Sequence, residues 1–182
     1  MCYSVQNELG IAKNQVKIVD YDPAWNALFA EIKTRICAVT SLQESRVQHI
    51  GSTAIPNIKS KPVIDILLGI DHLDQVDTYD EYLKPIGFYR LKVQRENEYV
   101  YAKFKDTAFE MKTHFIHMVQ FESDIWKNLI FFRDYLNTHP DKKIEYQNIK
   151  QSFVNLQSEG IQEYTTHKEA FIKNIFSLRH SL

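Results

Sequence analysis

An apolar run at residues 62–70, PVIDILLGI, constrains the fold of this chain more than any other stretch. The run is too uniformly apolar for a strand with one face in water, so it predicts a central strand covered on both faces. One aspartate, Asp65, stands in it between Ile64 and Ile66. Burying a charged carboxylate is unfavourable unless the group is paired or binds a ligand. The sequence therefore raises the question of whether Asp65 is a metal ligand or a hydrogen-bonded structural group.

Hydrophobic periodicity and turn residues predict the other elements around this strand. Asp22 and Pro23 are typical of a helix start, and the apolar residues that follow recur at helical spacing as far as Val39. Gly87 ends a second predicted helix. Strands are predicted at residues 16–21, 46–50, 62–70, 88–93, 98–104 and 109–121, and further helices at 73–86, 123–138, 141–156 and 160–178.

The composition fits one compact domain, because 44% of the 182 residues are hydrophobic and 25% are charged. We expect residues 1–14 to form a flexible N-terminal tail and residues 15–121 to form an α/β core. Residues 122–182 are expected to form a helical segment packed on that core. The predicted fold class is α+β, with a mixed β-sheet flanked by helices.

The charge balance limits the classes of partner. With 22 basic and 23 acidic residues the net charge is -1, which argues against broad binding to nucleic acid or to an anionic membrane. The N-terminal residues MCYSVQNELG lack the apolar core of a signal peptide, and no apolar run is long enough to span a bilayer. We therefore expect a cytoplasmic protein without a membrane span, in which Cys2 and Cys37 are free thiols.

A Gly-Ser turn ahead of the apolar run has the pattern of a phosphate-handling site. Gly51 and Ser52 leave room for backbone N–H groups and a hydroxyl to approach phosphate oxygens. Asp65 follows after twelve intervening residues, where a carboxylate can hold Mg²⁺ or Mn²⁺ against the same phosphates. Lys61, just before the strand, either contacts a phosphate or is solvated. Thr53 either joins in phosphate binding or, with Ser52, caps a short helix.

Histidines are the next candidates for the site, although a lone strand histidine is more often structural than a ligand. His114 and His117 differ by three positions, so a regular strand sends them to opposite faces and only one can join Asp65. We favour His117, as a metal ligand in place of a carboxylate or as a general base. His49 is either a further metal ligand or a structural partner of Asp65.

Other charged residues have a structural and a functional interpretation. Glu98 and Glu110 could supply a further carboxylate from a neighbouring strand, but we expect both to face water. Glu110 has the opposite strand parity to His117, so those two proposals compete. In the helical segment, Arg133 and Lys168 either fold over the cleft to bind phosphates or form exposed ion pairs, which stabilise little.

Several short segments together resemble a known family. The pattern Gly-Ser-(x12)-Asp-Ile-Leu resembles the signature of the nucleotidyltransferase superfamily, in which the strand after the turn carries two carboxylates at i and i+2. The segments YDPAW, HIGSTAIP, KPVIDIL, THFIHMV, FRDYL and HKEAFI, between Tyr21 and Ile172, resemble the GrpB family. This resemblance implies a nucleotidyltransferase-like mixed sheet flanked by helices with a C-terminal helical segment. Some relatives in that family are joined to dephospho-CoA kinase.

Two positions depart from the patterns that carry the resemblance. Leu67 stands where the superfamily has its second carboxylate, as it usually does in GrpB-like chains. A lone carboxylate holds Mg²⁺ weakly, because this ion prefers several oxygen ligands. Pro56-Asn57 replaces the usual Pro-Gly, and Asn is the next best residue for a left-handed turn.

Three functions are compatible with these residues. The resemblance favours a nucleotidyltransferase-like enzyme that binds a nucleoside triphosphate with Mg²⁺ or Mn²⁺ and transfers a nucleotidyl group to an unidentified acceptor. Leu67 favours an inactive module that binds a nucleotide or another small ligand. A metal-dependent hydrolase built on Asp65, His49 and His117 would bind metal without nucleotide. In each case the expected partner is a small molecule, and the sequence does not indicate an oligomeric state.

Overall fold

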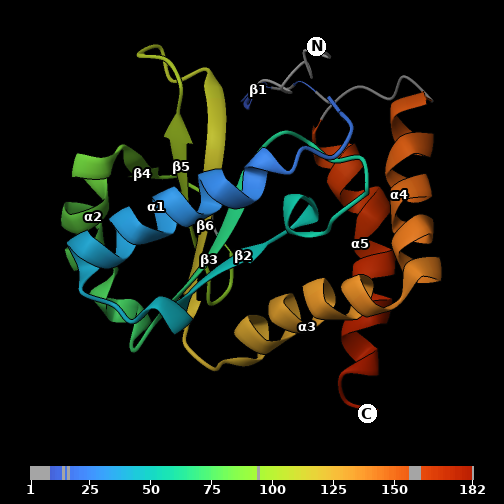
Figure 1. Cartoon of the computed structure of the whole chain (residues 1–182). Coiled ribbons are helices and arrows are strands. Elements are labelled where there is room, and N and C mark those ends of the chain that lie inside the picture. The colour runs from blue at the N-terminus through green and yellow to red at the C-terminus, as the bar shows by residue number, and fades with distance from the viewer. Residues whose placement is uncertain (1–8, 14, 16, 94, 156–160, 182) are drawn as a thin grey trace.

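The computed structural model describes residues 9–13, 15, 17–93, 95–155 and 161–181. This part of the chain forms a six-stranded sheet with helices on both faces (Figure 1), as the α+β prediction requires. The strands are β1 (Ile11–Ala12), β2 (Val47–Ile50), β3 (Ile64–Ile70), β4 (Phe88–Arg90), β5 (Tyr99–Phe104) and β6 (Met111–Gln120). The helices are α1 (Ala24–Thr40), α2 (Val76–Leu83), α3 (Asp124–Thr138), α4 (Pro140–Asn155) and α5 (Ile161–Leu178), with short 3₁₀ turns η1 (Glu44–Arg46), η2 (Ser52–Ala54), η3 (Leu73–Gln75) and η4 (Lys84–Ile86).

The order of strands across the sheet is β2-β3-β6-β5-β4, and β1 pairs with the start of β6. Strands β3 and β6 are parallel, and the other pairs are antiparallel. Asp65 pairs with Phe115, while Leu67 and Val100 lie on either side of His117. Because side chains alternate along a strand, this register puts Asp65, Phe115, His117 and Val100 on one face of the sheet.

Helices α1 and α2 cover the opposite face (Figure 1). The predicted apolar stripe of α1 packs onto alternate residues of β3, which confirms both the helix and the doubly covered strand. Gly87, at φ +90°, ends the turn after α2, as its position in the sequence predicts. The buried core on this face includes Trp25, Ile32 and Ile36 from α1 with Ile64, Ile66 and Leu68 from β3.

The face that carries Asp65 is covered in part by the C-terminal helices. Trp126 of α3 packs with Leu67, Ile50 and Val119. Helices α4 and α5 pack against α3 and against the loop that follows η2, in a second cluster that contains Ile55, Ile58, Phe132, Tyr146 and Phe171. The described parts of α3, α4 and α5 therefore lie on the core.

Some elements differ from the sequence prediction. The strand predicted at residues 16–21 is an isolated bridge between Val19 and Ser60. Within the predicted flexible tail, residues 11 and 12 form β1, while residues 1–8 and 14 of that tail lie outside the described residues. Asn57 has φ +64°, which confirms the predicted left-handed turn at the Pro56-Asn57 pair. The Val19–Ser60 bridge and the two-residue strand β1 depend on tertiary contacts, so they leave little periodic signal in the sequence.

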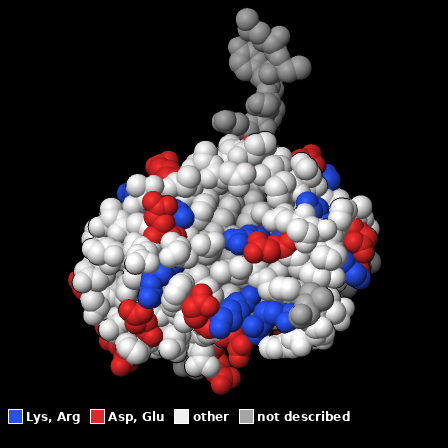
Figure 2. Space-filling model, turned by 60° about the horizontal axis from the view of Figure 1, so that its bottom comes forward, with Lys and Arg blue, Asp and Glu red and all other residues white. Residues whose placement is uncertain are grey.

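Charged residues of both signs lie on the face of the molecule drawn in Figure 2. Figure 2 shows acidic and basic side chains intermixed on the face that it presents, without a broad area of one sign. Within the described ranges, every helix is too short or too polar to cross a membrane.

Candidate functional site

A cavity of about 360 Å³ opens on the sheet face that carries Asp65 and His117. This volume lies in the range of small-molecule sites. Strands β3, β6 and β5 form its floor, and residues beside β1, the segment that joins β4 to β5, and α5 form its walls. Its apolar lining consists of Ile11, Ala12, Val63, Leu91, Val93, Val100 and Phe115.

Asp65 projects into this cavity from the start of β3, and 31% of its side chain is exposed. The backbone of Gly51 lies against it: a Cβ at position 51 would be 2.3 Å from Oδ2 of Asp65. Gly51 also has φ +71°, a conformation that other residues rarely adopt. The glycine of the Gly-Ser turn is therefore required by the carboxylate beside it, whereas the sequence interpretation assigned the free space to a phosphate.

His117 lies between two carboxylates. Its Nε2 is 3.7 Å from Oδ1 of Asp65, and its Nδ1 is 2.5 Å from Oε1 of Glu98. Burial by itself lowers the pKa of His117, but hydrogen bonds and charge from Asp65 and Glu98 outweigh burial and raise the pKa to about 9. His117 is therefore an imidazolium at neutral pH, whose Nδ1–H donates to Glu98 and whose Nε2–H faces Asp65 at ion-pair distance. In this state it can donate a proton, whereas metal ligation and general-base catalysis require the neutral ring.

Glu98 is a site residue that the sequence interpretation considered as a further carboxylate but expected to face water. Only 12% of its side chain is exposed, so the expectation that it faces water is wrong, while Glu110 is exposed as expected. Burial raises the pKa of Glu98, but the hydrogen bond and charge of His117, with help from Arg95, lower it overall. Glu98 has the strand parity of Val100, which pairs with His117. The Glu98 side chain therefore lies on the same sheet face as His117, but this can be inferred only once the pairing of β5 with β6 is known.

Lys61 and Lys168 line the cavity beside Asp65. Burial and the charge of Lys168 lower the pKa of Lys61 to about 8, against the opposing charge of Asp65. Lys168 comes from α5, so the C-terminal segment folds over the cleft as one of the two sequence interpretations requires. A pair of crowded cations beside a carboxylate can bind an anion, alone or with a cation shared by Asp65.

Three further cations line the same cavity: Lys13, Arg95 and Lys112. Lys112 reaches this face because β6 is irregular at its start. Lys103 pairs with His114 while Phe104 pairs with Lys112, so Thr113 is an extra residue opposite β5. Such a β-bulge re-aims the side chains that precede it. Lys112 consequently shares a face with Phe115, and its Nζ lies 5.7 Å from the centre of that ring.

His49 does not join Asp65 in the cavity. It pairs with Ile66, one position along from Asp65, and so faces α1, where its ring stacks on Phe29 at 4.7 Å. Its Nε2 lies 3.0 Å from Oγ1 of Thr53. Burial lowers the pKa of His49 to about 4, so the ring is neutral. His49 and Asp65 therefore point to opposite faces of the sheet and are not arranged to share a metal ion.

The hydroxyl groups of the Gly-Ser-Thr turn have structural partners. Thr53 is buried and donates to the backbone oxygen of Val63 at 3.2 Å. Oγ of Ser52 lies 3.4 Å from the hydroxyl of Tyr146 in α4. These are packing contacts, since no side chain caps η2, and neither Ser52 nor Thr53 lines the cavity.

Arg133 also lies outside the cavity lining. Its guanidinium donates to Oε1 of Gln48 at 3.1 Å and to the backbone oxygen of His49 at 3.0 Å. Its Nε donates to Asp134 at 2.7 Å. Arg133 therefore joins α3 to β2.

Lys150 is a buried cation that the site does not use. It is 1% exposed, and its Nζ donates to the backbone oxygen of Lys59 at 2.7 Å and lies 4.5 Å from the ring of Tyr146. Burial, with a smaller contribution from the charge of Lys168, lowers the pKa of Lys150 to about 7. This lysine fastens α4 to the loop that leads into β3.

The residues present do not form a complete metal site of their own. Among the described residues, no group of three or more His, Cys, Asp or Glu side chains is arranged to hold a metal ion. Leu67, in place of the second carboxylate, is fully buried against Trp126. Mg²⁺ is nevertheless commonly held by one or two carboxylates together with phosphates. Asp65 fits a cation that arrives with a phosphorylated ligand, and does not fit a resident one.

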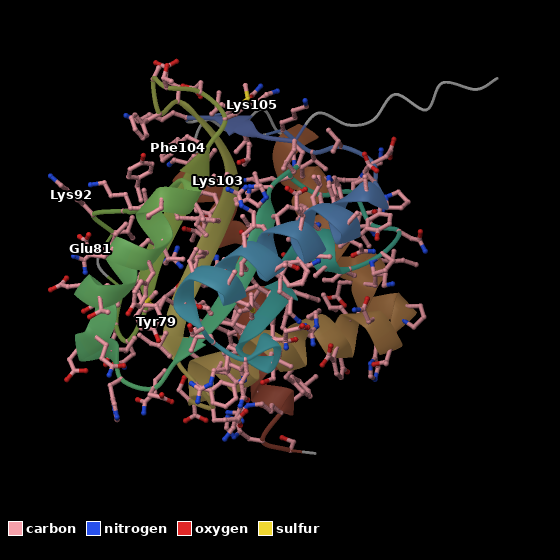
Figure 3. The ribbon with its side chains drawn as sticks, turned by 60° about the vertical axis from the view of Figure 1, so that its left-hand side comes forward. Tyr79, Glu81, Lys92, Lys103, Phe104 and Lys105 are labelled. Atoms are coloured by element: carbon pink, nitrogen blue, oxygen red, sulfur yellow. The ribbon has the colours of Figure 1, made fainter. Side chains whose placement is uncertain are left out.

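A wider hollow of about 760 Å³ lies between α2 and β4. Glu81 and Lys92, labelled in Figure 3, stand along this edge of the molecule with their side chains directed outward. Charged side chains in its lining pair with each other, since Arg90 lies 2.9 Å from Asp80. It lacks the shared carboxylate, histidine and lysine groups of the smaller cavity, so we assign the candidate site to the cavity around Asp65.

Comparison with known proteins shows relatives that match this chain over most of its length. The sequence pattern of the family described as GrpB protein matches residues 15–177. Glutamate-rich protein GrpB of Alkalihalophilus pseudofirmus is 36% identical over 171 residues, covering 93% of this chain and 98% of that protein. The crystal structure of conserved protein GrpB from Enterococcus faecalis has a TM-score of 0.75 at 27% identity, over 88% of this chain and 95% of that one.

A cytoplasmic RNA terminal U-transferase has a TM-score of 0.51 at 17% identity, over 86% of this chain and 46% of that one. At this identity the likeness concerns the fold alone, which is nucleotidyltransferase-like. The matches to GrpB proteins extend over nearly the whole chain in sequence and in structure. The chain belongs to the GrpB family.

Proposed function

We propose that this chain binds a nucleoside triphosphate in the cavity around Asp65 and transfers its nucleotidyl group to a small acceptor. One observation carries the proposal. On a nucleotidyltransferase-like fold, Asp65 shares a cavity with Lys61, from the segment just before β3, and with Lys168, from α5.

The phosphates would lie between Lys61 and Lys168. Burial and the charge of Lys168 disfavour the charged form of Lys61, as its lowered pKa indicates. An anion between the two lysines favours their charged forms, because opposite charges attract strongly in a site of low dielectric. A Mg²⁺ or Mn²⁺ ion held by Asp65 and the phosphates would supply further neutralisation of the phosphate charge.

The transfer step follows the ordinary course of phosphoryl chemistry. A hydroxyl oxygen of the acceptor forms a bond to the α-phosphorus, and the bond from that phosphorus to the bridging oxygen breaks. Pyrophosphate leaves with the electron pair, and the proton of the acceptor passes to solvent. Lys61 stabilises the charge that develops on pyrophosphate. His117, as an imidazolium between Asp65 and Glu98, can donate its proton to the leaving group and be reprotonated from solvent.

Thermal unfolding tests the binding step. The chain and an Asp65→Asn variant are melted with a panel of nucleoside triphosphates in Mg²⁺, Mn²⁺ or EDTA. Asp74→Asn makes the same chemical change at an exposed position and is the control. A ligand at 100 times its Kd adds about 2.7 kcal/mol to the free energy of unfolding. We expect a metal-dependent increase that Asp74→Asn keeps and Asp65→Asn loses. If no triphosphate stabilises the wild type, the proposal fails.

A second candidate is a module that binds the nucleotide without turning it over. The burial of Leu67 against Trp126 favours it, because this strand offers only one carboxylate and two-metal catalysis requires more. Pyrophosphate release separates the two functions. A chain that binds a triphosphate but releases no pyrophosphate with any of a broad set of small hydroxyl compounds is a binding module.

A further inference from the structure

The cavity around Asp65 concentrates positive charge in a chain whose net charge is -1. Four lysines line it: Lys13, Lys61, Lys112 and Lys168. Arg95 also lines the cavity, but its guanidinium pairs with Glu98 at 3.1 Å. Among the described residues of the lining, Asp65 is the only carboxylate. The four lysines are therefore the groups in the cavity that can bind an anion with several charges.

Backbone pairing places three of these lysines at one end of the sheet. The N–H of Gly10 donates to the oxygen of Pro62 at 2.7 Å, so β1 lies beside the segment that carries Lys61. On its other side, β1 pairs with β6 at Lys112. Lys13 directly follows β1 in the chain. The short strand β1 thus holds these three segments together.

These three lysines extend in one direction from Asp65 along the sheet. Asp65 pairs with Phe115, and both Lys61 and Lys112 come before that level of the two parallel strands. Because β1 runs antiparallel to β6, Lys13 lies beyond Lys112 in the direction away from Asp65. Positive charges in such a row match a chain of linked phosphates better than a single phosphate.

The bulge at Thr113 is required for this row of charges. Regular alternation back from Phe115 would turn the side chain at position 112 to the opposite face of the sheet. The extra residue restores it to the face of Phe115, where Lys112 lines the cavity. Lys168 reaches the same cavity from α5, and its charge lowers the pKa of Lys61, so these two amines are close to each other.

We propose that the four lysines form one polyphosphate site, in which Lys13 and Lys112 select three linked phosphates over two. Lys61 and Lys168 bind the phosphates nearer Asp65, and Lys112 and Lys13 bind the far end of the chain. The ligand chemistry is a run of linked phosphates, carried by a nucleoside triphosphate or by inorganic tripolyphosphate. For the nucleotide, this inference rests on the proposed function, because it concerns the phosphates of the same bound triphosphate.

Calorimetric titration of the full chain with inorganic tripolyphosphate and with pyrophosphate, at pH 7 in the same Mg²⁺ buffer, tests the selectivity. We expect the wild type to bind tripolyphosphate about tenfold more tightly than pyrophosphate, since charged hydrogen bonds to phosphate are strong. Lys112→Met should lose most of this preference, whereas Lys61→Met should weaken the binding of both anions alike. Lys13→Met is the second variant, in case loss of Lys112 disturbs the bulge.

Lys92→Met is the matched control, because Lys92 points outward near β4 (Figure 3) and does not line the cavity. It should leave both affinities unchanged. Equal affinity of the wild type for the two anions would overturn the selectivity. So would an unchanged preference in both Lys112→Met and Lys13→Met. A loss of preference in Lys92→Met as large as in those variants would indicate a general charge effect and would also overturn it.

The inference and the proposed function can fail separately. A nucleoside triphosphate and its diphosphate are titrated beside the inorganic anions. If the nucleoside triphosphate binds but Lys112→Met and Lys13→Met keep the wild-type ratio of its affinity to that of the diphosphate, the proposed function stands and the selectivity by these lysines fails. If no nucleotide binds while tripolyphosphate binds with a preference that Lys112→Met loses, the proposed function fails and the site is one for inorganic polyphosphate.

Discussion

Gly51 and Asp65 are packed so closely that a side chain at position 51 and the carboxylate cannot occupy their present positions together. The Cβ of an alanine would lie 2.3 Å from Oδ2 and 2.9 Å from Cβ of Asp65. Two constraints therefore require glycine at position 51: the position of the Asp65 carboxylate and the positive φ of the turn.

Substitution Gly51→Ala should lower the free energy of unfolding by roughly 1–3 kcal/mol, from backbone strain and the clash with Asp65. Gly87→Ala is a matched control, because Gly87 also has positive φ but its Cβ would come no closer than 3.6 Å to another atom. Denaturation in urea measures both. We expect the larger loss for Gly51→Ala, and a partial recovery when Asp65→Ala is combined with it. Equal losses without recovery would contradict the steric account.

The charge of His117 should make stability depend on pH. Its pKa is raised from 6.5 to about 9, so the folded state binds the proton more tightly than the unfolded state. The resulting stabilisation is complete below pH 6.5 and is lost as the pH rises through about 9. Each unit of pKa difference corresponds to about 1.4 kcal/mol.

Urea unfolding between these pH values measures this loss. The free energy of unfolding of the wild type should fall relative to that of His117→Gln. His114→Gln is the control, because burial lowers the pKa of His114 to about 4 and that ring stays neutral over the whole window. If the free energy of unfolding depends on pH in the same way in the wild type and in His117→Gln, the raised pKa assigned to His117 is wrong.

Anion affinity should fall above pH 8 because of Lys61. Burial and the charge of Lys168 lower its pKa to about 8. A bound anion favours the protonated amine, so affinity for pyrophosphate decreases as the pH rises through that value, approaching tenfold per pH unit. Lys61→Arg keeps its charge and should remove the decrease, whereas Lys61→Met should bind weakly at every pH. An unchanged pH profile in Lys61→Arg would exclude Lys61 as the titrating group.

The contribution of Lys150 to the free energy of unfolding should change with pH in the direction opposite to that of His117. Burial lowers its pKa from 10.5 to about 7, so the charge is disfavoured in the folded state. The disadvantage is complete below about pH 7 and is relieved as the pH rises towards 10.5. In the wild type this contribution increases with pH over that window, and in Lys150→Met it should be absent. Lys143→Met is the control, since Lys143 lies on the same helix and donates to the oxygen of Pro56 at 3.1 Å. A similar slope in Lys150→Met and the wild type would contradict burial of the charge.

The parts of the fold with strong local signals could be predicted from the sequence. The helical spacing from Trp25 onward and the apolar run around Asp65 identified α1 and β3, because each element is specified by residues close together in the chain. The short strand β1 could not be predicted, since its two residues are ordered only by pairing with β6.

The site was predictable only in part for the same reason. The environment of Asp65 and the opposite faces of His114 and His117 follow from strand parity. The contact between His117 and Glu98 depends on the pairing of β5 with β6, and the position of Lys112 depends on a bulge. Both are properties of register, which no local pattern in this sequence specifies. The Gly-Ser turn indicated where the site lies. The sequence interpretation assigned the space beside Gly51 to a phosphate, whereas the Asp65 carboxylate occupies it.

The walls of the cavity come from the whole length of the chain, from Ile11 in β1 to Lys168 in α5. During synthesis, the sheet can form as soon as β6 has left the ribosome, while the lysine from α5 arrives only later. A nascent or C-terminally shortened chain would therefore present a folded sheet whose Asp65 and His117 face water. The cavity around Asp65 would therefore gain its full lining only after α5, which carries Lys168, has been synthesised.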